Sequence, residues 1–397
     1  MKIIDDYNFK DKTALIRVDF NVPRDEQFQV IDRTRIQATA PTIQKVLNDG
    51  GRVVLMSHLG RPDGEFSEKY SLKGIVSEVS EVFNIPVKFV SDCVGEKVKN
   101  LVSELKNGRV LLLENLRFHK EEEAGDEKFS RGLANLGDIY INDAFATAHH
   151  SHASTVVVAR FFPERKCFGY LMTREIQAID KVLKNGQKPV IAILGGAKVS
   201  SKISVIKNIL PVVDHLLIGG GMAYTFIKAK GGKIGNSIVE DDKLDIALDV
   251  LKQAEKKNVQ IHLPVDVVVA DDFSNDARTK IVFVHNIPDA WKGLDIGPLS
   301  IEKFSKVIYA SKTILWNGPV GVFEVSNFFR GTSAIAEAIA NATQKGTFSL
   351  VGGGDSVAAV KKLGYEDKFS YVSTGGGAML ESLKGKKLPG VVAIMNN

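Results

Sequence analysis

Short apolar runs alternate with amphipathic stretches along most of this chain. In the first half, the pattern predicts strands separated by helices of about 10–15 residues, a spacing typical of βαβ units and a parallel sheet. The predicted strands are 13–18, 52–57, 85–89, 108–114 and 139–142, and the predicted helices are 36–48, 72–83, 94–105 and 127–135. These strands are almost continuously apolar, as expected when helices cover both faces of a sheet.

A helical pattern at 173–184 separates this series from a second one, and Thr173 is expected to cap its first turn. The second series begins at Val190 and continues to about Gly377. The 397 residues suffice for two domains, because a single core seldom exceeds roughly 250–300 residues. The pattern therefore predicts an α/β protein with two parallel-sheet βα domains joined by a helix, a plan typical of enzymes that close on their ligands.

Five apolar runs of the second series end in glycine. They are VIAILGG (190–196), HLLIGGG (215–221), TILWNGPVG (313–321), TFSLVGGGD (347–355) and SYVSTGGG (370–377). Glycine leaves backbone N–H groups accessible after a strand, beside the N-terminus of the next helix, where phosphate oxygens can bind. Ligands of open α/β sheets bind at that edge, so the five runs favour a polyphosphate site over tight turns alone.

Charged residues accompany three of these glycine segments. GGAKVSSK carries Lys198 and Lys202 four residues apart, and we expect both on one face of a first helical turn. Asp355 follows the run GGG, and a lone carboxylate beside phosphate oxygens suits Mg²⁺. Glu324 follows the rigid turn NGPVG and could accept from a ribose hydroxyl, although a helix-capping charge is the alternative interpretation.

The strand ends of the first series carry arginine and histidine in place of glycine. The segments are RVDFNVP (17–23), DRTRI (32–36), SHLGRP (57–62), ENLRFH (114–119) and DAFATAHHSHAS (143–154). Arginine offers fixed donors for phosphate and carboxylate oxygens, which predicts an anion site. Its expected members are Arg17, Arg35, Arg61, Arg117, His58, His149, His150 and His152, with Asp19 and Asn21 facing a substrate hydroxyl and carboxylate. Zinc is the alternative ligand for the histidines, but they lack the helical H-E-x-x-H spacing.

The composition and the absence of certain motifs argue against several classes of function. The net charge is +5 without a run of five Lys or Arg, which disfavours nucleic-acid binding. No apolar stretch approaches about 18 residues, and acidic residues near Met1 argue against a signal peptide, so we expect a cytoplasmic protein without membrane contact. Cys93 and Cys167 are expected to be reduced structural thiols without metal-binding neighbours. The P-loop and the dinucleotide fingerprint are both absent, which argues against Walker-type ATPases and dehydrogenases.

Taken together and in this order, the segments resemble those of phosphoglycerate kinases. The match includes RVDFNVP, SHLGRP, ENLRFH, GGAKVSSK, WNGPVGVFE, GGGDS, STGGGA and LPGV, and it extends over nearly the whole chain. The resemblance implies two Rossmann-like domains with a hinge cleft between them. Residues 1–171 would bind 3-phosphoglycerate, residues 172–384 would bind the Mg-nucleotide, and the tail 385–397 would pack back on the first domain. A hinge-bending solute-binding protein and a nucleotide-dependent dehydrogenase are the alternatives, and each lacks its expected signature: a signal peptide or a dinucleotide fingerprint.

The same resemblance implies a role for each matching residue. Substrate binding would involve Asp19, Asn21, Arg35, His58, Leu59, Gly60, Arg61, Arg117 and His150. The nucleotide would contact Gly195, Gly196, Lys198, Lys202, Gly219, Gly220, Asn317, Pro319, Gly321, Glu324, Gly352, Gly353, Gly354, Asp355 and Ser356, with Asp355 on the magnesium ion. Arg35, Lys198, Gly375, Gly376 and Gly377 would contact the phosphoryl group during transfer.

The implied reaction is reversible transfer between 1,3-bisphosphoglycerate and ADP, giving 3-phosphoglycerate and ATP, in glycolysis and gluconeogenesis. Transfer would be direct and in line, by a monomer, without a phosphoenzyme or a general base, because the accepting carboxylate is already ionised at neutral pH. One position departs from the family pattern, since His150 stands where arginine is usual. Histidine is shorter and only partly charged at neutral pH. Either phosphoglycerate binds more weakly and with more pH dependence, or the neighbouring arginines compensate.

Overall fold

The computed structural model describes residues 1–396 and divides the chain into two compact units. Unit 1 comprises Met1–Ile176 together with the C-terminal segment that begins at Lys387, and unit 2 comprises Gln177–Lys386. The sequence places the domain boundary at 171/172, whereas the units divide within helix α6 (Tyr170–Leu183). Of the predicted tail, Asn397 lies outside the described residues. None of the helices among residues 1–396 could span a membrane.

Unit 1 contains a six-stranded parallel sheet of order β3-β4-β2-β1-β5-β6. The strands are β1 (Thr13–Arg17), β2 (Arg52–Met56), β3 (Val87–Phe89), β4 (Val110–Leu112), β5 (Ile139–Asn142) and β6 (Lys166–Phe168). Every residue of β1 and β5 is buried, because helices cover both faces of the sheet. The five strands predicted for the first half are thus confirmed, most of them with shorter ends.

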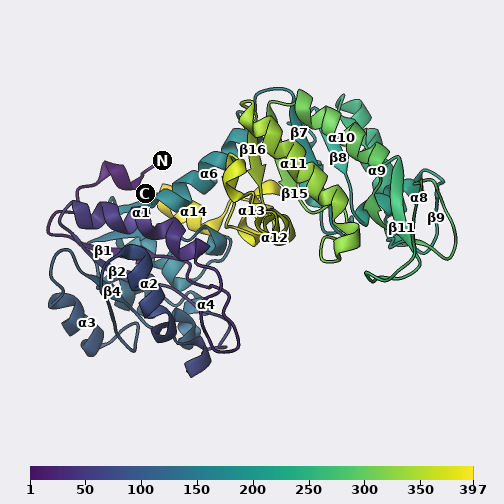
Figure 1. Cartoon of the computed structure of the whole chain (residues 1–397). Coiled ribbons are helices and arrows are strands. Elements are labelled where there is room, and N and C mark those ends of the chain that lie inside the picture. Colours follow the sequence, from purple (N-terminus) through teal and green to yellow (C-terminus); the bar gives the residue numbers. More distant parts are fainter. Residues whose placement is uncertain (397) are drawn as a thin grey trace. The chain divides into compact units, whose positions relative to one another are not determined.

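The helices of unit 1 include α1 (Thr34–Asn48), α2 (Val76–Phe83), α3 (Glu96–Ser103), α4 (Lys120–Ala124), α5 (Glu127–Ala134) and α14 (Pro389–Met395). The helix predicted at 72–83 is divided, since a 3-10 turn at Leu72–Ile75 precedes α2. Ser71 Oγ accepts from the Lys73 N–H at 3.2 Å and closes that tighter turn. The C-terminal helix α14, yellow in Figure 1, is anchored by the Gly390 N–H, which donates to the Ala148 carbonyl at 2.8 Å.

Unit 2 contains a second six-stranded parallel sheet, of order β10-β8-β7-β15-β16-β17. Its strands are β7 (Val190–Leu194), β8 (His215–Ile218), β10 (Gln260–His262), β15 (Thr313–Asn317), β16 (Phe348–Val351) and β17 (Tyr371–Val372). Five neighbouring strands are the five apolar runs that end in glycine. Because the strands are parallel, all five glycine loops leave the sheet at the same edge.

Besides part of α6 and three short 3-10 helices, unit 2 contains seven α-helices and two small sheets. The helices are α7 (Ile203–Ile209), α8 (Met222–Ala229), α9 (Leu244–Lys256), α10 (Pro298–Ala310), α11 (Arg330–Gln344), α12 (Gly354–Lys362) and α13 (Gly377–Leu383). One small sheet is antiparallel, with β11 (Asp266–Ala270) between β12 (Thr279–Phe283) and β14 (Lys292–Ile296); the other pairs β9 (Lys233–Ile234) with β13 (Asn286–Ile287). The sequence analysis predicted only parallel sheets, so it missed the antiparallel sheet of β11, β12 and β14.

Two local predictions are wrong. Thr173 does not cap the long helix, because α6 begins at Tyr170 and the Thr173 N–H already donates to the Gly169 carbonyl at 3.0 Å. Lys198 and Lys202 do not share a first helical turn, because α7 begins only at Ile203. The segment before α7 is instead fixed as a loop, in which the Gly196 N–H donates to the Pro319 carbonyl at 3.1 Å.

Candidate active site

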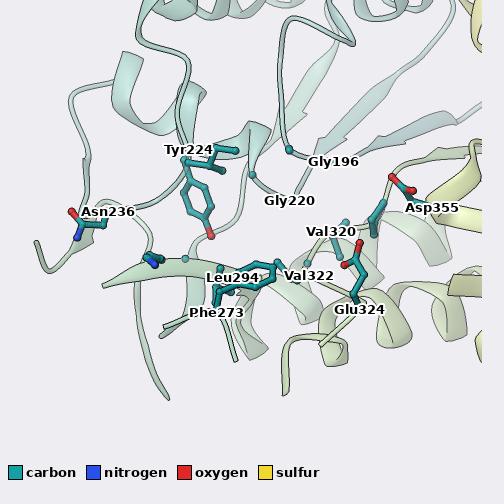
Figure 2. Close-up of a pocket in the computed structure, with 17 residues that line it drawn as sticks. Gly196, Gly220, Tyr224, Asn236, Phe273, Leu294, Val320, Val322, Glu324 and Asp355 are labelled. Carbon is teal, nitrogen blue, oxygen red and sulfur yellow. The ribbon is translucent and has the colours of Figure 1, made fainter. Parts of the chain in front are cut away.

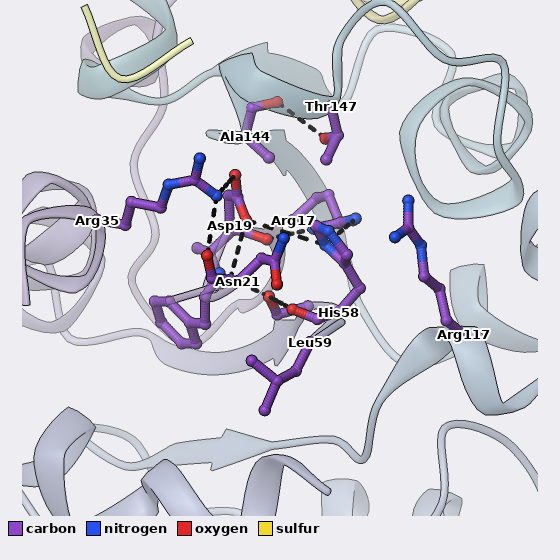
Figure 3. A network of polar contacts seen from close by, with 12 residues as sticks. Arg17, Asp19, Asn21, Arg35, His58, Leu59, Arg117, Ala144 and Thr147 are labelled. Atoms are coloured by element: carbon purple, nitrogen blue, oxygen red, sulfur yellow. Dashed lines mark hydrogen bonds and ion pairs between the residues drawn. The ribbon is translucent and has the colours of Figure 1, made fainter. Parts of the chain in front are cut away.

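A polar network follows the carboxyl ends of β1 and β2 in unit 1 (Figure 3). The Arg35 guanidinium donates to Asp19 Oδ2 at 2.7 Å and to the Asn21 carbonyl at 3.1 Å. Asn21 Oδ1 accepts from the Gly60 N–H at 2.9 Å, and His58 Nδ1 lies 3.9 Å from Asp19 Oδ1. Five of the predicted substrate-binding residues therefore come together at one sheet edge.

Arg17 lies beneath this network and is only 1% exposed. Its Nε donates to Ser154 Oγ at 2.8 Å, and Ser154 Oγ donates to the buried Glu122 carboxylate at 2.6 Å. Another guanidinium nitrogen lies 3.3 Å from His58 Nδ1. Arg17 was expected among the residues that face the anion, but its position instead lets it balance the charge of Glu122 and orient His58.

Arg117 extends the network toward Gly60, whose carbonyl accepts from Arg117 Nη1 at 2.9 Å. Its guanidinium also pairs with Glu123 at 3.0 Å. Burial lowers the pKa of Arg117, and the nearby charges of Arg17 and Arg61 lower it further. Leu59 is buried, and its carbonyl accepts from the Asn115 side chain at 2.7 Å. This arrangement fixes the backbone of the SHLGRP loop beside the guanidinium groups.

Three histidine rings of the loop after β5 lie next to one another, with His150 and His152 stacked and His149 tilted against His150. The ring centres of His149 and His150 are 3.8 Å apart, and those of His150 and His152 are 4.7 Å apart. Burial, then His149 and Arg117, lowers the pKa of His150; burial and His150 lower that of His152 to about 3. Burial and Arg17 hold the pKa of His58 well below its usual range. At neutral pH the rings of His58, His150 and His152 are therefore uncharged, and arginine supplies positive charge to the site.

Cys93 does have metal-binding neighbours, so that prediction is wrong. Ligand atoms of Asp92, Cys93 and His119 all lie within 4.8 Å of one another, because the 3-10 turn Leu116–Phe118 brings His119 back to the loop after β3. His119 Nε2 and Asp92 Oδ1 are 3.0 Å apart, and the Cys93 thiol donates to the Glu114 carbonyl at 3.0 Å. Hydrogen bonds within the protein account for this arrangement.

A cavity of about 470 Å³ opens among the glycine loops of unit 2 (Figure 2). Of the predicted nucleotide-binding residues, Gly196, Gly220, Pro319, Gly321, Glu324 and Asp355 line it. An apolar wall that the sequence analysis missed is formed largely by Tyr224, Phe273, Leu294, Val320 and Val322. Figure 2 shows Tyr224 and Phe273 on one side of the cavity and Asp355 on the other. Such a wall with polar groups at one end suits a nucleoside.

A second cavity, of about 400 Å³, lies where α12 and α13 begin. Its predicted lining residues are Lys202, Asn317, Gly353, Gly354, Asp355, Ser356, Gly376 and Gly377. Lys202 donates to the Asn317 side chain; burial lowers its ammonium pKa, while Asp355 opposes that shift. Asp355 lines both cavities, so the apolar cavity and this polar one meet at a carboxylate.

Two glycines of the second cavity have backbone angles that other residues rarely adopt. Gly353 precedes α12 with φ of 93°, and a Cβ atom there would lie 2.7 Å from Asn317 Nδ2. Gly376 precedes α13 with φ of 41°. Loops with such angles at the start of a helix can present backbone N–H groups to an anion, and both glycines line this cavity.

The other predicted residues of unit 2 line neither cavity. They are Gly195, Lys198, Gly219, Gly352 and Gly375. Four of them hold the loops in place, as when the Gly195 N–H donates to the Asn317 carbonyl at 3.1 Å and the Gly375 N–H donates to Ser373 Oγ at 3.0 Å. Lys198 is exposed in the loop before α7.

Comparison with known proteins decides the family. The sequence model described as Phosphoglycerate kinase matches residues 4–386, nearly the whole chain. The chain belongs to the phosphoglycerate kinase family. A phosphoglycerate kinase of Porphyromonas gingivalis is 52% identical to it over 98% of this chain and 99% of that protein. A cytosolic phosphoglycerate kinase of Nicotiana tabacum is 50% identical over 98% and 96%.

A solved structure of the same family supports the fold. The phosphoglycerate kinase from Coxiella burnetii matches with a TM-score of 0.90 at 39% identity, covering 99% of this chain and 98% of that one. The predicted family and the predicted α/β fold with two parallel-sheet domains are thus confirmed. Membership makes the protein a phosphotransferase with a carboxyl group as acceptor.

Proposed function

We propose that this protein catalyses reversible, Mg²⁺-dependent phosphoryl transfer between 1,3-bisphosphoglycerate and ADP, giving 3-phosphoglycerate and ATP. The main observation behind this proposal is that one chain of this family contains two candidate anion sites. Unit 1 offers an arginine–carboxylate network, and unit 2 offers an apolar cavity that continues into a glycine-lined one. The first suits a small phosphorylated acid, and the second suits a nucleoside polyphosphate.

Phosphoglycerate would bind through the side chains of unit 1. Arg35, Arg61 and Arg117 would hold its phosphate and carboxylate, because the neighbouring histidines carry little charge at neutral pH. Asp19 and Asn21 would contact its hydroxyl, with His58, Leu59, Gly60 and His150 completing the site. Asp19 already fixes Arg35 at 2.7 Å, so little side-chain order remains to be gained on binding.

The nucleotide would place its base against Tyr224 and Leu294 and its phosphates beside Gly353 and Gly376. The exposed Asp355 carboxylate stands where the two cavities meet. A single carboxylate next to phosphate oxygens and water matches what Mg²⁺ prefers, so Asp355 fits as its protein ligand. When bound, the ion would neutralise phosphate charge. The predicted contacts of Gly195, Gly219, Gly352 and Lys198 remain part of this proposal.

Transfer would be direct and in line, without a phosphoenzyme. The carboxylate of 3-phosphoglycerate is ionised at neutral pH, so no side chain has to remove a proton. Arg35, Lys198 and the N–H groups of Gly375, Gly376 and Gly377 would stabilise the charge of the phosphoryl group in flight. Both substrates must be adjacent and shielded from water, so we propose that the protein closes on them by hinge bending.

The cellular setting follows from the same proposal. The reaction would run in glycolysis and gluconeogenesis, catalysed by a cytoplasmic monomer that acts on small molecules and needs no nucleic acid or membrane. The cytosolic name of the relative from Nicotiana tabacum supports this placement.

Trapping of the acyl phosphate tests the proposed reaction. Purified protein is given 3-phosphoglycerate, ATP and Mg²⁺, and hydroxylamine converts any acyl phosphate to a hydroxamate. We expect hydroxamate that depends on all three and is lost when Mg²⁺ is chelated. Absence of hydroxamate while calorimetry shows both substrates bound would contradict the proposed function.

A further inference from the structure

A third cavity lies within unit 1 beneath the C-terminal helix α14 and shares no lining residue with the candidate active site. Its volume is about 560 Å³. Three of its lining residues are cations: Arg160 from the 3-10 helix Val158–Phe161, Lys166 from β6, and Lys387 just before α14. Val156, Val392 and Ala393 contribute apolar surface. None of the described residues that line the cavity carries a carboxylate.

In the part of the chain that the structure describes, these three cations form no ion pair with a carboxylate, because none of them has a carboxylate within 4.0 Å. Lys166 is only 5% exposed. Burial lowers the pKa of its ammonium group, and Lys2 lowers it further. Glu164 has the opposite effect, but that carboxylate is already paired with Lys2 at 2.7 Å.

A cationic side chain that is largely withdrawn from water is costly unless it is paired or loses its charge, and an anion bound beside it would supply that pairing. Surface cations alone would not mark a site, because water solvates them well. Here one cation is buried, two exposed cations lie on the same cavity, and all three belong to different segments of unit 1.

We propose that this cavity binds a small phosphorylated anion. Its phosphate oxygens accept from Lys166, Arg160 and Lys387, and its short carbon portion contacts Val156, Val392 and Ala393. Such a ligand would contact the start of the C-terminal segment, strand β6 and the 3-10 helix Val158–Phe161. Its binding therefore adds to the attachment of α14, which already depends on the bond from Gly390 to Ala148.

Inorganic pyrophosphate, without Mg²⁺, is the probe, and the full-length protein is labelled with ¹⁵N. Pyrophosphate will also bind in the active site, so the measurement must distinguish binding in the cavity from binding in the active site. Amide shifts of Val156, Val392 and Ala393 report on the cavity. Three variants are compared: Arg160→Gln, Lys166→Met, and Arg165→Gln as the matched control, since Arg165 lies next to Lys166 in sequence but its guanidinium stands over the Phe162 ring.

We expect saturable shifts at the three amides in the parent protein and in the Arg165→Gln control. In Arg160→Gln and Lys166→Met the same shifts should need about tenfold more pyrophosphate or more. Arg160 is exposed, so its replacement tests the site even if Lys166→Met alters folding. Equal titration curves in Arg160→Gln and the control would overturn the proposal. Shifts that rise linearly without saturation, or that occur only around the glycine loops, would overturn it as well.

Discussion

The two anion sites of this protein differ in what they present to a ligand. Unit 1 presents side chains, held by contacts such as that of Arg35 with Asp19 at 2.7 Å. Unit 2 presents backbone, at loops where Gly353 and Gly376 have positive φ, with Lys202 and Asp355 as the charged side chains of the glycine-lined cavity. Ligand binding in unit 1 should therefore be most sensitive to removal of a side chain, whereas ligand binding in unit 2 should be most sensitive to the addition of a methyl group at a glycine of these loops.

The largest effect is expected from Lys198, the exposed cation of the loop before α7. Lys198→Ala should lower kcat by about 10²–10³-fold, because the ammonium group would stabilise charge only during transfer. The KM for phosphoglycerate should change less than about twofold, since that ligand belongs to unit 1. Steady-state kinetics with both substrates varied measures this, and an unchanged kcat would remove Lys198 from the mechanism.

Arg61 should behave in the opposite way. Arg61→Ala is expected to raise the KM for phosphoglycerate by about 10–100-fold with little change in kcat, because a charge-assisted hydrogen bond in the ground state is lost. Arg131→Ala is the control, since Arg131 pairs at the surface with Glu127 at 3.3 Å. A loss confined to kcat would contradict the binding role of Arg61.

We expect the site of unit 1, which is formed by side chains, to make the stability of the protein depend on pH. His152 has a folded pKa of about 3, below the ordinary histidine value near 6.5. The unfolded chain therefore binds the extra proton as the pH falls, and stability present above pH 6.5 is lost below it. His152→Asn should reduce the slope of unfolding free energy between pH 6.5 and 5 by at most about 1.4 kcal/mol per pH unit.

In the parent protein and in His152→Asn alike, Asp143 and Asp295 change the unfolding free energy with pH in the opposite direction. Burial raises their folded pKa values to about 6 and about 7. The difference between parent and variant removes their contribution. Urea unfolding at several pH values measures it, and parallel pH profiles would show that the His152 ring stays accessible to protons in the folded state.

The smallest effect is expected at His150, where arginine is usual in the family. His150→Arg should lower the KM for phosphoglycerate by about two- to fivefold, since it restores a charge near the arginine network. Because the pKa of His150 in the folded protein is lowered, the parent protein gains a positive charge at this position only at acidic pH. The ratio of the two KM values should therefore widen from pH 5.5 to 8. A constant ratio of one would mean that Arg61 and Arg117 suffice.

Sequence patterns predicted the elements whose signals are local. Each glycine-ended run, such as that at β7 and Gly195, carries its strand and its loop within a few residues, and the family segments carry the site residues. The position of Arg17 was not predictable in this way, since it depends on Ser154, 137 residues along the chain. The apolar wall around Tyr224 and Phe273 was missed for the same reason, because separate segments of unit 2 build it.

The most direct test of the central comparison adds one methyl group at equivalent turns of the two units. Gly353 and Gly95 both precede a helix, with φ of 93° and 99°, so alanine should cause similar backbone strain at each. At Gly353 the new Cβ meets Asn317, whereas at Gly95 nothing lies within 4 Å. Calorimetric titration with ADP should show about tenfold weaker binding for Gly353→Ala and unchanged binding for Gly95→Ala, with phosphoglycerate binding kept in both. Unchanged ADP affinity in Gly353→Ala would contradict recognition of the nucleotide by the backbone.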